Sequence, residues 1–182
     1  DQGLIHPITM LKDTTVSYGG FNPENFDRDL SGPVHEKDAL IRSRNIPAVN
    51  LAIQLKTQGL YGFLKKAGMA PLKDESYYGL ALALGGAEMS MEKLGELYAM
   101  LANSGGLRPL RYFKTEDNSL REQLLSGEAC YMVLDMLEEN PRPGQGFRQE
   151  WTADSLPVAW KTGTSYGFRD AWSAGIFCHY VL

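Results

Sequence analysis

Apolar residues recur with the period of a helix through the middle of the chain. The pattern predicts helices that begin at Glu36, at Pro47, at Gly59, after the N-cap Ser90 and after the N-cap Ser126. The helix from Glu36 is expected to break over residues 43–47, because a residue before proline is biased out of the helical region. Two helices are therefore expected to meet at this break.

The two ends of the chain lack the helical period. Residues 1–35 are rich in turn formers and predict an extended loop with one short strand. Strands are predicted over residues 111–115 and 157–164 and, after a turn at Tyr166-Gly167, over residues 172–182. Helices in the middle and strands at the end predict an α+β fold in which helices flank an antiparallel sheet.

Composition narrows the class of protein. The chain has 182 residues, 43% of them hydrophobic and 22% charged, which predicts one globular domain over residues 1–182 and excludes overall disorder. A net charge of −4 provides no general attraction to nucleic acid. No apolar run is long enough to span a membrane, and no histidine pair has the spacing of a zinc helix. We expect no metal and no cofactor, and we expect the chain to be a piece of a longer protein, incomplete at both ends.

The most suggestive segment is Lys161-Thr162-Gly163-Thr164, on a predicted strand. Lys161 and Gly163 share one face of such a strand, and Thr162 and Thr164 share the other. An ammonium group, two hydroxyls and an exposed N–H could hold a peptide that ends in a carboxylate. An ordinary strand that enters a turn explains the segment equally well.

A second candidate is Ser43-x-Asn45, at the predicted break between helices. Serine and asparagine also suit such breaks for structural reasons, because their side chains bond to nearby backbone. The order of the two motifs is more informative than either alone. Ser-x-Asn followed by Lys-Thr-Gly is typical of penicillin-binding proteins and serine β-lactamases.

The likeness extends beyond the two motifs. The chain resembles the transpeptidase domain of bifunctional class A penicillin-binding proteins over the segments 39–50, 82–90, 98–103, 160–165 and 168–172. The resemblance implies a serine D,D-transpeptidase that cross-links peptidoglycan stem peptides with a D-Ala-D-Ala end and that binds β-lactams. It also implies a location on the periplasmic side of the bacterial inner membrane, through an anchor segment absent from these residues.

Carried over to this sequence, the resemblance assigns a role to each motif residue. Ser43 would relay a proton near the attacking group, and Asn45 would bind the substrate peptide. Lys161 would supply positive potential. Thr162 and Thr164, with Gly163 between them, would hold the terminal carboxylate, and the N–H of Thr164 would be an oxyanion donor.

The family's nucleophile motif, Ser-x-x-Lys, should precede Ser43 and does not. The one match, Ser90-Met91-Glu92-Lys93, comes later, where Ser90 is already expected to cap a helix. We therefore expect the nucleophile upstream of Asp1 and an isolated chain without catalytic competence. A D,D-carboxypeptidase or β-lactamase-type hydrolase and a non-catalytic module that binds peptide carboxylates remain open as alternatives.

Overall fold

The computed structural model describes residues 1–56, 59–69, 71–141, 156–165 and 169–182, and the chain forms two compact units. The N-terminal unit comprises residues 2–88 and 164–171, and the C-terminal unit comprises residue 1 with residues 89–163 and 172–182. The expectation of one domain over residues 1–182 stays a prediction. The predicted turn at Tyr166-Gly167 lies outside the described residues.

The N-terminal unit begins with two antiparallel strands, β1 (Met10–Asp13) and β2 (Gly32–His35), in which Leu11 lies opposite Val34. The loop expected over residues 1–35 thus contains a pair of strands where the sequence predicted one. Leu11 and Val34 pair across the ladder, and the side chain of Val34 is buried.

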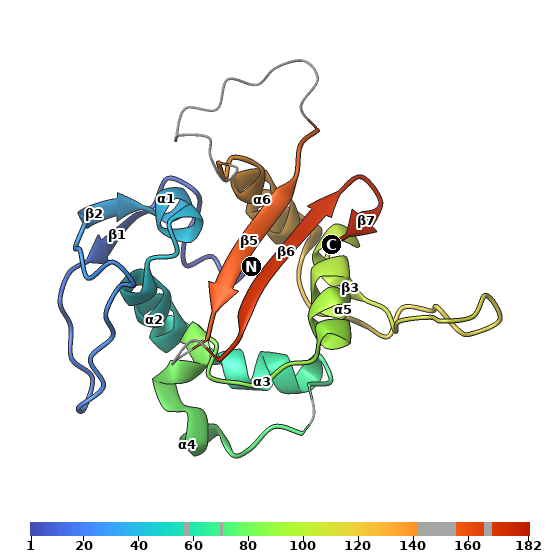
Figure 1. Ribbon diagram of the computed structural model, residues 1–182, viewed down its shortest axis with the longest axis horizontal. Coiled ribbons are helices and arrows are strands. Elements are labelled where there is room, and N and C mark those ends of the chain that lie inside the picture. Colours follow the sequence, from blue (N-terminus) through green and yellow to red (C-terminus); the bar gives the residue numbers. More distant parts are fainter. Residues whose placement is uncertain (57–58, 70, 142–155, 166–168) are drawn as a thin grey trace. The chain divides into compact units, whose positions relative to one another are not determined.

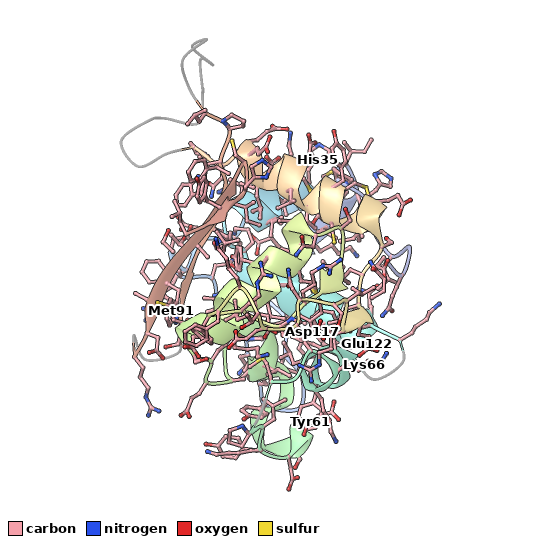
Figure 2. All side chains as sticks on the ribbon, turned by 90° about the vertical axis from the view of Figure 1, so that its right-hand side faces the viewer. His35, Tyr61, Lys66, Met91, Asp117 and Glu122 are labelled. Atoms are coloured by element: carbon pink, nitrogen blue, oxygen red, sulfur yellow. The ribbon has the colours of Figure 1, made fainter. Side chains whose placement is uncertain are left out.

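Helices follow β2 in the N-terminal unit. They are α1 (Glu36–Ile41), α2 (Asn45–Gln54), α3 (Gly59–Lys66), α4 (Glu75–Tyr78) and the 3-10 helix η1 (Gly79–Leu84). The α2 helix packs against η1, β1 and α1, and its residues Ile46 and Val49 are fully buried. On α3, the hydroxyl of Tyr61, labelled in Figure 2, donates to the carbonyl of Lys73 at 3.1 Å.

In the C-terminal unit, α5 (Met91–Ala102) and α6 (Gly127–Glu138) both begin where the sequence predicted. The Ser90 hydroxyl accepts from the Lys93 amide, and the Ser126 hydroxyl accepts from the Ala129 amide. Met91, the first residue of α5, is exposed (Figure 2). Along the chain between these two helices lie two short strands, β3 (Gly106–Leu107) and β4 (Glu122–Gln123), which pair antiparallel.

The strand predicted over residues 111–115 was wrong. These residues belong to an irregular connection between β3 and β4, in which Asp117 is labelled in Figure 2, as is Glu122, the first residue of β4. The carboxylate of Glu116 accepts from the amides of Tyr112 and Phe113 at 2.6 and 3.1 Å and so turns the chain. Both aromatic side chains are exposed, so this segment has no buried face that would hold it in a sheet.

The last strands form one sheet in the order β5 (Ala159–Thr164), β6 (Ala171–Phe177) and β7 (Tyr180–Val181). The second β run predicted from the sequence is therefore a hairpin, because β6 turns back at Cys178-His179 to pair with β7. This sheet includes the predicted Lys161-Thr162-Gly163-Thr164 strand.

Two glycines of the C-terminal unit offer a matched test of backbone constraint. Gly105 has a φ of +86°, and a Cβ there would lie 2.0 Å from the Leu125 carbonyl oxygen, whereas a Cβ at Gly95 within α5 would meet nothing within 4 Å. We expect Gly105→Ala to lower the free energy of unfolding by about 2–3 kcal/mol. Gly95→Ala should raise it by about 0.5–1 kcal/mol, because alanine loses less backbone entropy in a helix. Urea denaturation measures both, and equal effects of the two substitutions would contradict this account.

Candidate active site

The Ser43-Arg44-Asn45 segment forms the turn between α1 and α2. The amides of Ser43 and Arg44 donate to the carbonyls of Leu40 and Ala39 at 3.1 and 2.9 Å, which is the bonding pattern of a Schellman helix end. Ser43 has a φ of 53°, the left-handed position that glycine usually occupies. Its side chain is exposed. Ser104, which follows α5, has the same φ and the same helix-end bonding, so this conformation belongs to the helix end and leaves the Ser43 hydroxyl exposed.

The side chain of Arg44, by contrast, is buried in the N-terminal unit. Its Nε donates to Asp13 Oδ2 at 2.7 Å, its Nη1 donates to Asp27 Oδ2 at 2.7 Å, and its Nη2 donates to the carbonyl of Asp29. Asp13 and Arg44 are 0% and 4% exposed, whereas Asp27 is accessible to solvent. A buried ion pair resists separation, because each charge left alone would be desolvated.

The charges of this network persist at neutral pH. Burial by itself raises the pKa of Asp13, but hydrogen bonds from Asn25, the Ser31 amide and Arg44 outweigh it. The pKa of the Asp13 carboxyl therefore lies below its usual 3.8. The hydrogen bond from Arg44 is the main cause that lowers the pKa of Asp27. Burial opposes the charge of Arg44, and its two carboxylate partners more than offset this, so its pKa is raised.

Asn25 joins the network to the beginning of α2. Its Nδ2 donates to Asp13 Oδ1 at 2.7 Å and to the Asp29 carbonyl at 2.9 Å. Its Oδ1 accepts from the amide of Asn45 at 2.9 Å. The side chain of Asn45 donates in turn to the carbonyl of Glu24 at 2.8 Å. Residues 24–29 thus hold the Ser43-x-Asn45 turn through both its backbone and its side chains.

The Lys161-Thr162-Gly163-Thr164 segment lies on β5, as predicted. The Lys161 ammonium donates to the carbonyl of Thr162 at 2.8 Å, and its partial burial lowers the pKa of the lysine. Thr162, Gly163 and Thr164 are exposed, and a Cβ at Gly163 would meet nothing within 4 Å. The strand therefore offers two hydroxyls and open space above its backbone.

A reciprocal pair of hydrogen bonds fixes β5 to the end of α6. Asn140 Nδ2 donates to the Trp160 carbonyl, and Trp160 Nε1 donates to the Asn140 carbonyl, both at 3.0 Å. Because β5 is the first strand in the order β5-β6-β7, it has a strand partner on one side only among the described residues. Its other edge can pair with an extended peptide.

The structure thus brings together the members of each motif. Ser43 and Asn45 share one turn, and Lys161, Thr162, Gly163 and Thr164 share one strand. That both motifs line a single cleft stays a prediction. Sequence reasoning missed the buried support formed by Asp13, Asn25 and Arg44, since it interpreted residues 22–29 only as turn formers.

The Ser90-x-x-Lys93 match is structural. Ser90 Oγ accepts from the Lys93 amide at 3.2 Å as the N-cap of α5, and the Lys93 ammonium pairs with Glu96. The lysine is thus directed to a carboxylate within its own helix. This arrangement confirms Ser90 as a helix cap.

Comparison with known proteins identifies the family. The model of the penicillin binding protein transpeptidase domain matches residues 1–175. The chain belongs to this family. It is 35% identical over its whole length to penicillin-binding protein 1C of Escherichia coli, of which it covers 23%. It is also 30% identical, over 93% of its length, to penicillin-binding protein 1F of Bacillus subtilis, of which it covers 25%.

Solved structures confirm the predicted fold. Penicillin-binding protein PonA1 of Mycobacterium tuberculosis superposes with a TM-score of 0.73 at 19% identity over 95% of this chain and 53% of that one. Penicillin-binding protein 1A of Haemophilus influenzae gives 0.67 at 22% identity over 94% of this chain and 33% of that one. The α+β fold is thus that of a penicillin-binding protein. The chain spans about a quarter of the length of the curated relatives it matches.

Among the described residues no helix is both long and apolar enough to cross a membrane. In the same ranges no group of three or more histidine, cysteine, aspartate or glutamate side chains could hold a metal ion.

The buried ion pair predicts a large and pH-dependent effect. Asp13→Ala leaves Arg44 without its buried partner and should lower the free energy of unfolding by about 3 kcal/mol at pH 7. Because the pKa of Asp13 is lowered in the folded protein, its contribution is complete above about pH 3.8 and declines as the pH falls further. Urea denaturation of Asp13→Ala and the parent across this range provides the measurement. A constant difference between the two at all pH values would contradict the assignment.

Proposed function

We propose that the chain forms part of a peptidoglycan D,D-transpeptidase that cross-links stem peptides by serine acyl transfer and binds β-lactams. The main support is the combination of an exposed, left-handed Ser43 at a rigidly held helix–helix turn with an exposed Lys-Thr-Gly-Thr strand edge, in a member of the transpeptidase family.

The reaction proceeds in two acyl transfers. A serine outside these residues attacks the carbonyl of the penultimate D-Ala, and the terminal D-Ala leaves with a proton on its amine. An amine of a neighbouring stem peptide then attacks the ester, loses a proton and releases the serine hydroxyl. Ser43 relays a proton between the nucleophile and the leaving amine, and Asn45 hydrogen-bonds the substrate peptide.

The β5 strand holds the end of the substrate. The hydroxyls of Thr162 and Thr164 donate hydrogen bonds to its carboxylate, and Gly163 between them leaves room for the peptide. The ammonium of Lys161 attracts the carboxylate, and its partial burial strengthens this attraction, because less water screens it. The N–H of Thr164 donates to the oxyanion that develops on the attacked carbonyl. We also propose that the protein acts on the periplasmic side of the inner membrane, as the family resemblance implies.

The role proposed for Lys161 predicts how its substitution affects acylation by a β-lactam. In the full-length protein that carries this chain, Lys161→Ala should lower the second-order rate constant for acylation by a fluorescent penicillin by roughly 10²-fold. Lys93→Ala is the matched control, because it also removes an ammonium group. Lys93 belongs to the Ser90-x-x-Lys93 match, whose serine caps α5, so the acylation rate should not change. Equal losses in the two variants would refute the assignment of β5.

The position of the nucleophile predicts a second outcome. The 182-residue chain alone should form no covalent adduct with penicillin, because Ser90 serves as a helix cap. The full-length protein should be labelled on a serine of a Ser-x-x-Lys motif upstream of Asp1. Intact-mass and peptide analysis decides this, and label on Ser90 would overturn the proposal.

Analysis of the reaction products distinguishes the proposed transpeptidase from the two alternatives, a hydrolase and a non-catalytic binding module. With a stem peptide and an amine acceptor, a transpeptidase gives a cross-linked product and free D-Ala, whereas a D,D-carboxypeptidase gives free D-Ala and the shortened stem. A β-lactamase-type enzyme instead hydrolyses a β-lactam to the ring-opened product. A non-catalytic module gives none of these products, although it retains the peptide. We expect the cross-linked product.

A further inference from the structure

We propose that Asn25 is a positioning residue for the candidate active site, which fixes the direction in which Asn45 presents its side-chain amide to the substrate. The proposal rests on the proposed function of Asn45. Asn25 lies twenty positions upstream, is only 3% exposed and cannot touch substrate itself. Its effect must therefore pass through Asn45.

The first step concerns the beginning of α2. The N-cap residue of this helix, Arg44, makes no side-chain cap hydrogen bond, because a guanidinium has only donors and cannot accept from a backbone amide. Asn25 Oδ1 takes over this role by accepting from the Asn45 amide at 2.9 Å, with the Ile46 amide at 3.5 Å. A residue distant in sequence thus caps the helix and fixes the backbone of Asn45.

The second step shows that the amide of Asn25 can adopt only one orientation. Its Nδ2 lies 2.7 Å from Asp13 Oδ1 and 2.9 Å from the Asp29 carbonyl oxygen. Both are acceptors, so only the NH₂ group can face them. A flipped amide would place an oxygen against a buried carboxylate and an NH₂ group against the Asn45 N–H. The ion network therefore dictates that Oδ1 faces α2.

The third step concerns the side chain of Asn45. Its Nδ2 donates to the carbonyl of Glu24, the residue adjacent to Asn25, at 2.8 Å. This bond fixes which edge of the Asn45 amide faces the loop. Within the described parts of the chain, no hydrogen bond engages its Oδ1. Oδ1 and the second N–H of Nδ2 can then accept from and donate to a peptide bond of the substrate.

The test measures whether Asn25 acts through Asn45. In the full-length protein, we expect Asn25→Ala to lower the second-order rate constant for acylation by a fluorescent penicillin at least about tenfold, and Asn45→Ala to lower it further. The double variant should equal Asn45→Ala within about twofold, because the amide that Asn25 orients is then absent. Glu24→Ala is the matched control, since only the backbone carbonyl of Glu24 is used, and it should match the parent.

Several results would overturn the proposal. An unchanged rate in Asn25→Ala, or losses that multiply in the double variant, would show that Asn25 does not act through Asn45. An unchanged rate in Asn45→Ala would refute the proposed function of that residue and the inference with it. The two failures are thus distinguishable, because the first leaves the loss in Asn45→Ala intact.

A second variant covers the case in which Asn25→Ala does not fold. Asp27 is accessible to solvent and accepts from Arg44, so Asp27→Ala loosens the same loop without emptying a buried site. We expect a rate loss of a fewfold in the parent background and none in the Asn45→Ala background, with the thermal unfolding midpoint recorded for each. Equal rate losses in both backgrounds would contradict the inference.

Discussion

The buried ion pair between Arg44 and Asp13 is the interaction on which the Ser43-x-Asn45 turn depends. Both side chains are almost inaccessible to solvent, so neither charge is stable without the other. Arg44 belongs to the turn between two helices, whereas Asp13 ends β1. Because the pair must form for either segment to pack, it couples the strand pair and the loop that follows β1 to the position of the turn.

The helices could be predicted from sequence because their information is local. Ser90 and Ser126 cap α5 and α6 as expected, and apolar periodicity identified both. The helix predicted from Pro47 begins at Asn45 instead, since the cap comes from Asn25 and no local residue signals it. The segment 111–115 has strand-like residues but lies exposed, so propensity alone gave the wrong element.

The residues of the candidate site also fall into those that local sequence reveals and those that depend on long-range contacts. Ser43, Asn45 and the Lys161–Thr164 strand could be found from sequence, because a short motif keeps their spacing. The residues that hold them could not. Asp13 ends β1, Asn25 and Asp29 lie in the loop that follows it, and their hydrogen bonds to Arg44 and Asn45 join segments far apart in the sequence. Asn140, which anchors β5 through Trp160, belongs to neither motif, and its partner lies twenty positions away.

The contrast between neighbouring residues explains how such a site can be both exposed and rigid. In the turn, Arg44 is buried while Ser43 is exposed in a left-handed conformation that costs about 1 kcal/mol or more. In β5, Trp160 is bound to Asn140 while Thr162 to Thr164 are exposed. In both segments the exposed motif residues lie on the same short element as a residue that long-range hydrogen bonds hold in place. Loss of those hydrogen bonds would loosen the backbone that presents the exposed groups.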